Sequence, residues 1–383
     1  VRLPILTAVP FFETLELSAS GRYADYTSSG GNFTWNVSGL WAPTQDILFR
    51  GTYAKAVRAP NINELFDPAQ GAFFRPVDPC DVGNLVSGPD AALRQANCTA
   101  FFNSIGFDPT FGTGNYSYVD PLTARFSGTQ AGNPNLDVET ATTWTVGTQL
   151  TPRFLPGLVV SVDYYNIEIE DAINNVSAQD IVDNCVDSST IQNQFCDLVT
   201  RNPANGGFTF LQQVLLNFAR QETAGVEFAA RDRFDVGDHT FTLNASGTWV
   251  DKLNDFFDPN DLTFVDPELG ELQRPEWAGR ASLTWDWNAL SVTWGTTYLD
   301  SQALRAVSIE DVGTTGTDTY SPDNAITDET FIHDISFSYE VNDMFDVYGG
   351  VNNIFNEKPF ITEQAFPVSP VGTYFFLGAR VAM

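Results

Sequence analysis

The chain ends in the stretch PVGTYFFLGARVAM, residues 370–383, and the side-chain pattern of this stretch decides the fold class. Successive side chains of a β-strand point to opposite faces, so the stretch has two different sides. The apolar side carries Phe375, Leu377, Ala379, Val381 and Met383, and the other side carries Tyr374, Phe376, Gly378 and Arg380. A soluble sheet would bury the apolar side in a core, whereas a membrane barrel would expose it to lipid.

The composition excludes several classes of protein. The 383 residues include 19 basic and 48 acidic ones, and the net charge of −29 excludes a nucleic-acid-binding protein, which needs a basic face to meet phosphates. Hydrophobic residues make up 43% of the chain, yet no run of 18 apolar residues occurs, so a transmembrane helix is not expected. A β-barrel is compatible with this composition because its lipid-facing residues alternate with polar ones.

The same alternation recurs in the interior of the sequence. Apolar and polar residues alternate with a period of two, which helical spacing does not fit. The clearest segments are 33–41, 240–249, 282–287 and 290–298. Their polar sides are rich in Ser, Thr, Asn and Gly, which suits a wet lumen, and their aromatic ends suit the belts at membrane interfaces. Trp249, Trp285 and Trp294 are therefore predicted to face lipid rather than a dry core.

The connections between the predicted strands are of two lengths. The short ones are 42–46, 151–157, 235–238, 286–289 and 342–344, and the long ones are 57–138, 172–211, 251–274, 300–328 and 353–369. Tight turns on one side and long loops on the other are typical of an outer-membrane barrel, whereas loops of about 30 to 80 residues are abnormal in a soluble sandwich. The sequence thus predicts an all-β fold, an antiparallel transmembrane β-barrel, with about twelve strands: 12–26, 32–41, 46–56, 139–150, 158–170, 214–233, 239–250, 278–286, 289–299, 329–341, 345–352 and 371–383.

Four motifs in this order resemble a known family. Residues 53–60 read YAKAVRAP and continue to ELF at 64–66, which is similar to the "FRAP…EL" segment of TonB-dependent outer-membrane receptors. The GNPNL stretch with the following Glu-Thr, 132–140, resembles the family's "GNP.L.PE" entry into a strand. DYYNI at 163–167 and GVNNIFN at 350–356 resemble two further family signatures. The resemblance covers essentially the whole chain.

The resemblance implies an outer-membrane active transport receptor of a Gram-negative bacterium. Family members carry an N-terminal TonB box and a plug domain inside a barrel of 22 strands. Neither of these, nor a signal peptide, is recognisable here, so residues 1–383 are expected to be a partial barrel domain, the C-terminal half, with open edges or closed as a smaller barrel. The implied partners are outer-membrane lipid, the TonB complex through the missing N-terminal part, and a small-molecule ligand such as a siderophore, cobalamin, a saccharide or a peptide.

Four cysteines lie within two of the long connections. Cys80 and Cys98 lie in one of them, and Cys185 and Cys196 lie in the other. No pair has CxxC spacing, and the chain has only two histidines to complete a zinc site. Two disulfides that staple the outer loops are the preferred interpretation, with free buried thiols or a metal site as alternatives.

The same long loops supply the candidate ligand-binding residues. Planar rings cover an apolar or sugar ligand at low entropic cost, and loops on a rigid barrel carry recognition. The candidates are Phe73, Phe74, Arg75, Phe101, Phe102, Tyr116 and Tyr118. The alternative is that these side chains pack against one another to order the loop. Arg58 is predicted to be paired in the wall, and Asn133-Pro134-Asn135 to form a turn.

Catalysis has little support in the sequence, and no cofactor is expected. Neither His239 nor His333 accompanies a nucleophile in an elbow motif, and no phosphate-cradling sequence is present. The acidic residues Asp251, Asp255, Asp258 and Asp261 lack the pattern of an EF-hand loop and predict a solvated negative rim. A passive porin-like or autotransporter-type barrel remains the first alternative to the receptor, and a soluble all-β carbohydrate-binding or hydrolytic protein the second.

Overall fold

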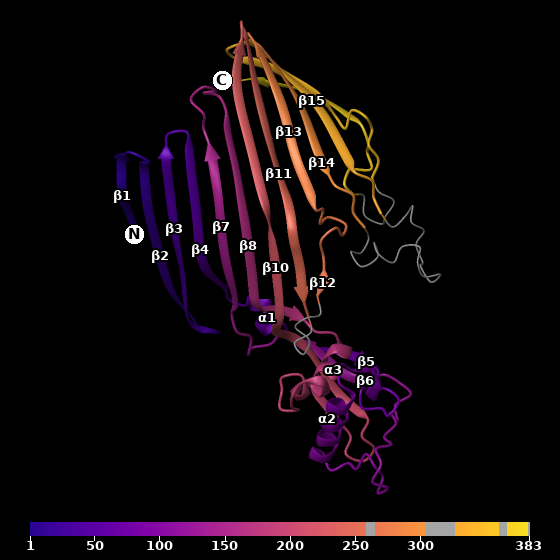
Figure 1. The fold of residues 1–383 in the computed structure, drawn as a ribbon. Coiled ribbons are helices and arrows are strands. Elements are labelled where there is room, and N and C mark those ends of the chain that lie inside the picture. The colour runs from indigo at the N-terminus through magenta and orange to yellow at the C-terminus, as the bar shows by residue number, and fades with distance from the viewer. Residues whose placement is uncertain (258–264, 304–325, 360–365, 382–383) are drawn as a thin grey trace.

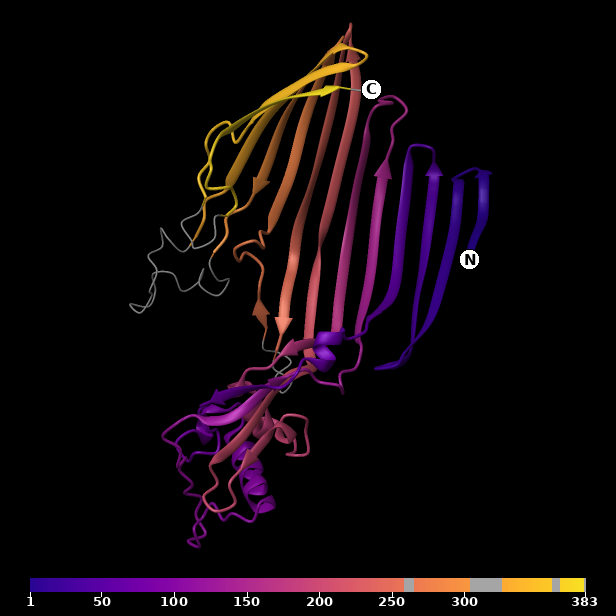
Figure 2. The same ribbon diagram turned by 180° about the vertical axis from the view of Figure 1, so that it is seen from behind.

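The protein consists of a tall curved wall of strands and a small folded lobe at one end of it (Figure 1). The structure, a computed structural model, describes residues 1–257, 265–303, 326–359 and 366–381. The short turns lie at one end of the wall, and the lobe lies beyond the other end (Figures 1 and 2). We call these two parts the wall and the lobe.

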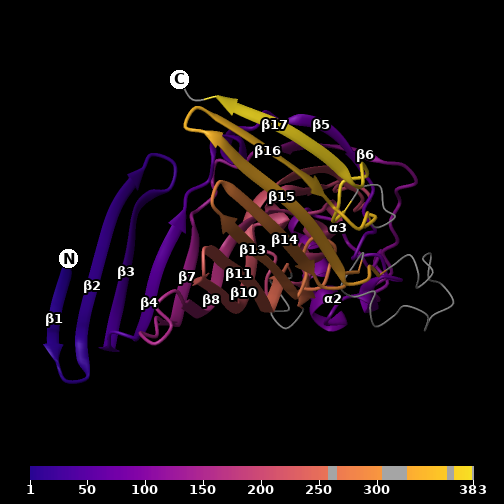
Figure 3. The same ribbon diagram turned by 90° about the horizontal axis from the view of Figure 1, so that it is seen from above.

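The wall is a single antiparallel sheet in which each strand pairs with the next. In the described residues it consists of thirteen strands: β1 (Arg2–Val9), β2 (Phe12–Tyr26), β3 (Gly30–Thr44), β4 (Ile47–Arg58), β7 (Glu139–Leu150), β8 (Val159–Asn175), β10 (Phe208–Val236), β11 (His239–Phe256), β13 (Trp277–Trp287), β14 (Leu290–Leu299), β15 (Thr330–Asn342), β16 (Phe345–Asn352) and β17 (Tyr374–Val381). No pairing within this described part of the chain joins β1 to β17, so the curved sheet is open (Figure 3). The predicted fold class is confirmed, with open edges rather than a smaller closed barrel.

The register places the apolar side chains in rows on the outer side of the wall. Leu243 lies opposite Leu283, which lies opposite Trp294, which lies opposite Ile335. Leu283 and Trp294 are 42% and 38% exposed in the isolated chain, so this row does not enter a core. Trp249 and Trp285 are half-buried, and no second sheet covers the outer side of the described wall.

The C-terminal strand shows this arrangement most clearly. On β17, Phe375 and Leu377 are 76% and 77% exposed, as the alternation predicts for the apolar side. Met383, which was assigned to the same side, lies outside the described residues. The apolar side of this strand therefore faces the surroundings of the wall.

Aromatic side chains form two belts on the outer side of the wall. Near the short turns, Trp41 contacts Phe49 and Phe234 contacts Phe241, with ring centroids 5.4 Å apart in both pairs. Nearer the lobe, a second belt contains the pairs Trp35–Tyr53, Trp144–Tyr164 and Trp249–Trp277. On β11 the belts are eight residues apart, about 26 Å along the strand. This spacing suits the apolar band of an outer-membrane barrel, which is about 25 Å tall.

The lobe is built from two of the long connections and is a correction to the sequence analysis. Residues 57–138 and 172–211 were expected to be loops. They instead contain α1 (Ile62–Phe66), β5 (Gln70–Phe74), η1 (Leu85–Ser87), α2 (Ala91–Ser104), β6 (Phe126–Ala131), α3 (Ala178–Asp187), η2 (Cys196–Leu198) and β9 (Val199–Arg201). The apolar content of these segments is sufficient for a separate core, which orders them.

Strand β10 belongs to both parts of the molecule. Near the short turns it pairs with β8 and β11 in the wall. At the opposite end, which begins at Phe208, it pairs with β6 and β9 in the lobe, and we call this its outer end. The predicted strand 214–233 is therefore too short by several residues at its outer end. The short strand β12 (Asp266–Pro267) pairs with the outer end of β11.

Strand β1 was missed by the sequence analysis. Its stretch, RLPILTAV, does not alternate cleanly and contains a proline, which cannot donate a hydrogen bond to the ladder. The register shifts between Pro4 and Leu6, which lets the strand pair with β2 in spite of the proline. Among the described residues, no helix is both long enough and apolar enough to cross a membrane.

Candidate binding site at the outer end of the wall

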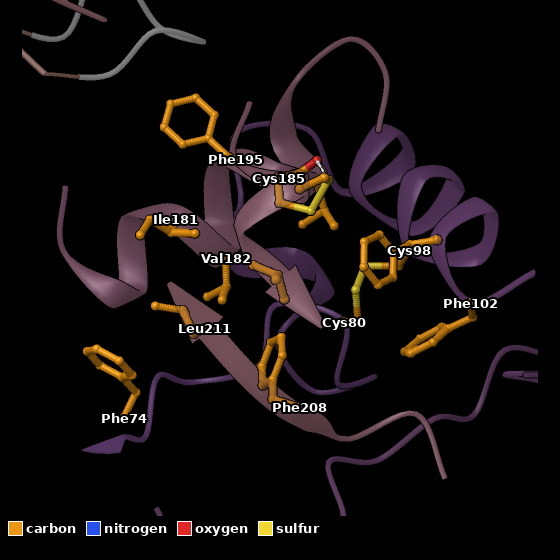
Figure 4. Close-up of a cluster of buried hydrophobic side chains, with 14 of the residues drawn as sticks. Phe74, Cys80, Cys98, Phe102, Ile181, Val182, Cys185, Phe195, Phe208 and Leu211 are labelled. Carbon is orange, nitrogen blue, oxygen red and sulfur yellow. Dashed lines mark hydrogen bonds between the residues drawn. A yellow bond between two sulfur atoms is a disulfide. The ribbon is translucent and has the colours of Figure 1, made fainter. Parts of the chain in front are cut away.

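The lobe has a hydrophobic core that sets the positions of its surface residues. Figure 4 shows side chains from α2, α3 and β10 gathered around the two disulfides. Cys80 is bonded to Cys98 and Cys185 to Cys196, with Cα–Cα distances of 5.5 and 4.5 Å. The predicted disulfides are therefore confirmed. They connect α2 to the irregular segment before it and α3 to η2, so the lobe has covalent as well as apolar support.

A buried ion pair lies within this core. The guanidinium of Arg201 donates to both carboxylate oxygens of Asp78, at 2.7 Å each, and its carbon lies 3.8 Å from the centroid of the Phe208 ring. The hydroxyl of Tyr118 donates to the same carboxylate at 3.0 Å. Burial, and then the negative charge of Asp78, raise the pKa of Tyr118, so the hydroxyl stays protonated. These hydrogen bonds give the pair a structural role.

Most of the predicted ligand-binding residues pack within the lobe. Phe74, Phe101, Phe102 and Tyr118 are buried core residues. Tyr116 is half-buried and its hydroxyl donates to the carbonyl oxygen of Cys80 at 2.7 Å. Arg75 forms an ion pair with Asp120 and donates to the carbonyl oxygen of Leu122. Phe73, which is 69% exposed, is the member of the set whose ring is open to a ligand. Ligand binding by this set stays a prediction.

Arg58 connects the wall to the first helix of the lobe. Its guanidinium donates to Glu139 on the neighbouring strand β7 and to Glu64 in α1. Glu64 also accepts a hydrogen bond from the backbone of Asn61, which completes a capping box at the start of α1. The prediction that Arg58 is paired in the wall agrees with these contacts.

The turn after β6 holds the other end of α1. The backbone N–H of Gly132 donates to the carbonyl oxygen of Asp67 at 3.0 Å, and that of Asn133 donates to the carbonyl oxygen of Glu64 at 2.8 Å. A Cβ at Gly132 would lie 2.6 Å from the backbone nitrogen of Asp67, so only glycine permits this approach. The side chain of Asn133 donates to the carbonyl oxygen of Leu215 in β10. Helix α1 is thus fixed to both the wall and the lobe.

The inner side of the wall is polar and hollowed. Arg50 forms an ion pair with Asp163 across β4, β7 and β8. A hollow of about 720 Å³ farther along the wall is lined by the side chains of Arg231, Asn244, Arg280, Ser282 and Asp334, among others. Within the described part of the chain, no group of three or more His, Cys, Asp or Glu side chains is arranged to hold a metal ion. Of the acidic rim, Asp258 and Asp261 lie outside the described residues.

An apolar outer side, a polar inner side and a folded lobe at one end define the wall of a membrane β-barrel. The family model for the TonB dependent receptor-like β-barrel matches residues 7–354. The chain therefore belongs to the TonB-dependent receptor β-barrel family, as the four motifs indicated.

Two solved siderophore receptors have a similar fold. A variant of the ferric enterobactin receptor PfeA from Pseudomonas aeruginosa matches with a TM-score of 0.60 at 14% identity, over 98% of this chain and 43% of the receptor. The siderophore receptor PirA from Acinetobacter baumannii matches with a TM-score of 0.57 at 15% identity, over 96% and 43%. The chain thus spans less than half the length of these receptors. No curated protein matches the sequence.

Sequence reasoning missed the residues that hold the lobe together. Arg201 and Asp78 are 123 positions apart, and neither belongs to a recognisable motif. Glu64 was noted only as part of the "EL" segment, although an Asn three positions before a Glu is a capping-box signal that predicts a helix start there.

Proposed function

We propose that this chain forms the barrel wall and an outer ligand-capture lobe of an active transport receptor in the outer membrane of a Gram-negative bacterium. The main support is the two-sided wall, which is apolar outside and polar inside, in a chain that belongs to the TonB-dependent receptor family. The apolar outer side suits lipid contact, and the polar inner side suits a wet or protein-filled lumen.

Transport in this proposal uses energy from the TonB complex, which acts through a part of the protein outside residues 1–383. The ligand first binds tightly at the lobe end of the receptor, which faces the outside of the cell. Coupling then shifts the receptor to a state that binds the ligand weakly, because a conformational change drives release only when the two states differ in affinity. The wall and lobe supply a rigid frame for this cycle, and the ligand is not chemically changed.

The ligand is a scarce small molecule that outer-membrane diffusion does not supply. The names of PfeA and PirA describe siderophore receptors, which favours a siderophore, while cobalamin, a saccharide and a peptide are further candidates. The identities of 14% and 15% are too low to choose among these classes.

Uptake in living cells tests the proposal. The whole natural protein would be produced in a Gram-negative host, with and without a functional TonB complex. Growth would be measured with each candidate ligand as the sole source of the nutrient that it carries. We expect the protein in the outer-membrane fraction and growth only when the TonB complex is functional. Recovery from the soluble fraction, or uptake that does not need the TonB complex, would refute the proposal and favour a soluble protein or a passive pore.

A further inference from the structure

A small crevice lies where the lobe meets the wall. It has a volume of about 280 Å³ and lies between α1, the wall-side ends of β5 and β6, and the part of β10 beside them. Its polar lining consists of five side-chain amides and one carboxylate: Asn63, Gln70, Gln130, Asn175, Gln213 and Asp67. This is just below the roughly 300 to 1,000 Å³ that is typical of small-molecule sites, so the crevice suits a small ligand.

The three glutamines form a row across neighbouring strands. Gln70 on β5 lies opposite Gln130 on β6, and Gln130 lies beside Gln213 on β10. The Nε2 of Gln130 donates to the Oε1 of Gln213, and the Nε2 of Gln213 donates to the carbonyl oxygen of Val176, at 2.7 Å each. These bonds fix the orientation of both amides. Gln130 lines the crevice, and among the described residues its Oε1 accepts no hydrogen bond.

Two other amides of the crevice are not used by the fold. Within the described part of the chain, the side chains of Asn63 and Gln70 form no hydrogen bond, and both residues are exposed. Each amide offers two N–H donors and one carbonyl acceptor. The α1 side of the crevice is held in place by the close approach of Gly132 to Asp67. The crevice therefore presents free hydrogen-bonding groups on a fixed frame.

The chemistry of these groups selects the ligand. An amide both donates and accepts hydrogen bonds, and so does a hydroxyl group, which makes several amides around one crevice complementary to a polyhydroxylated ring. No Lys or Arg lines the crevice, and the chain has a net charge of −29, so an anionic ligand finds no charged partner. Asp67 accepts hydrogen bonds from hydroxyls, and the apolar side chains of Pro68 and Val214 also line the crevice.

We propose that this crevice binds one or two sugar rings of a neutral, polyhydroxylated ligand. The inference deepens the proposed function, since it names a ligand class for the outer end of the receptor. Binding itself does not require transport. Failure of uptake with intact binding would refute the proposed function alone, and intact uptake without sugar binding would refute this inference alone.

Titration of the purified full chain tests this proposal. The protein would be held in a detergent without a sugar headgroup and titrated with neutral trisaccharides (maltotriose, cellotriose, xylotriose, mannotriose and chitotriose), with trigalacturonate and trialanine for comparison. We expect at least one neutral trisaccharide to bind at least ten-fold more tightly than trigalacturonate and trialanine. Absence of neutral-sugar binding up to about 10 mM, weaker than about −3 kcal/mol, would overturn the proposal. Tighter binding of trigalacturonate or trialanine would also overturn it.

Single substitutions locate the binding to the crevice. Asn63→Ala and Gln70→Ala each remove one unused amide, and we expect each to weaken binding about five- to ten-fold, the loss of one or two hydrogen bonds. Gln95→Ala, at an exposed glutamine on α2, is the matched control and should bind like the unaltered protein. Unchanged affinity in both crevice variants would overturn the assignment, and unchanged thermal unfolding would show that the substitutions leave the fold intact.

Discussion

The wall and the lobe place their apolar side chains in opposite directions. In the wall, apolar rows point outward and polar rows point inward, and the described strands enclose no dry core. In the lobe, apolar side chains point inward around two disulfides and a buried ion pair. The two parts differ because the outer side of the wall suits contact with lipid, whereas the surface of the lobe suits contact with water.

Strand β10 contains both arrangements of apolar side chains within one element. At its outer end, Phe208, Leu211, Val214 and Leu216 are buried in the lobe, and their spacing departs from strict alternation. Toward the short turns, Phe228 and Phe234 are 38% and 45% exposed on the outer side of the wall. The surroundings of each segment, more than the strand conformation, decide which residues it needs.

The largest expected effect concerns the core of the lobe, where apolar side chains point inward. Arg201→Ala leaves the carboxylate of Asp78 buried without its partner, and we expect a loss of about 3 to 5 kcal/mol from the stability of the lobe. Hydrogen–deuterium exchange on the full chain in detergent would show faster exchange in α2, α3 and β9 and unchanged exchange in β13 to β16. Arg125→Ala, at an exposed arginine of the same lobe, is the control and should have little effect. Equal effects of the two variants would contradict the structural role of the buried pair.

The second prediction tests the outward-facing wall with two adjacent residues. Leu283→Arg places a charge on the apolar side, and we expect a loss of about 2 to 4 kcal/mol in lipid vesicles if this position lies near the midplane. Ser282→Arg places the same charge on the polar inner side, where it lines the hollow, and should cost much less. The measurement is the urea midpoint of heat-modifiable gel migration. A larger loss for Ser282→Arg would mean that the two sides have been assigned the wrong way round.

The third prediction removes one disulfide to test whether the lobe can lose stability while the wall stays folded. Replacing Cys80 and Cys98 by serine should destabilise the lobe by about 3 kcal/mol, as the chain-entropy model gives for a loop of this length. Exchange protection should fall in α2 and η1, while the gel migration of the wall stays the same. Reducing agent should act similarly on the unaltered protein. Loss of the folded wall in the double variant would show that the two parts do not fold as separately as the comparison suggests.

The smallest expected effect lies at the junction. The side chain of Asn217 on β10 donates to the carbonyl oxygens of Asp137 and Asp171, and it accepts from the backbone of Asp137. Asn217→Ala should therefore cost about 1 kcal/mol and speed exchange in residues 133–138 and 171–175. Asn103→Ala, at an exposed asparagine of α2, is the control. Unaltered exchange in both segments would show that other contacts hold the junction.

The wall could be predicted from the sequence because its pattern is local. Alternation with a period of two is visible within ten residues, so twelve of its strands were found, and only β1, with Pro4 in a poorly alternating stretch, was missed. The disulfides could also be predicted from the sequence, since each pair of cysteines lies within one connection. These features need no knowledge of distant contacts.

The lobe could not be predicted in the same way because its contacts are distant in sequence. The buried side of α2 packs against α3, about ninety positions later, and Asn97 donates to carbonyl oxygens of Val186 and Ser188. For the aromatic residues of the lobe, ligand contact and mutual packing both stayed open, because nothing in their local pattern distinguishes a packed ring from an exposed one. Phe102 and Phe73 are both loop phenylalanines in the sequence, yet one is fully buried and the other is exposed.

The continuity of β10 has a mechanical consequence. A receptor that captures its cargo on a tethered arm lets the arm swing, whereas here one hydrogen-bonded strand of 29 residues runs from the lobe to the far turns of the wall. Tilting the lobe would have to unzip the ladder near the register shifts between Asn217 and Gln221. In the proposed receptor, a ligand held at the lobe is therefore presented at a fixed height and angle relative to the wall.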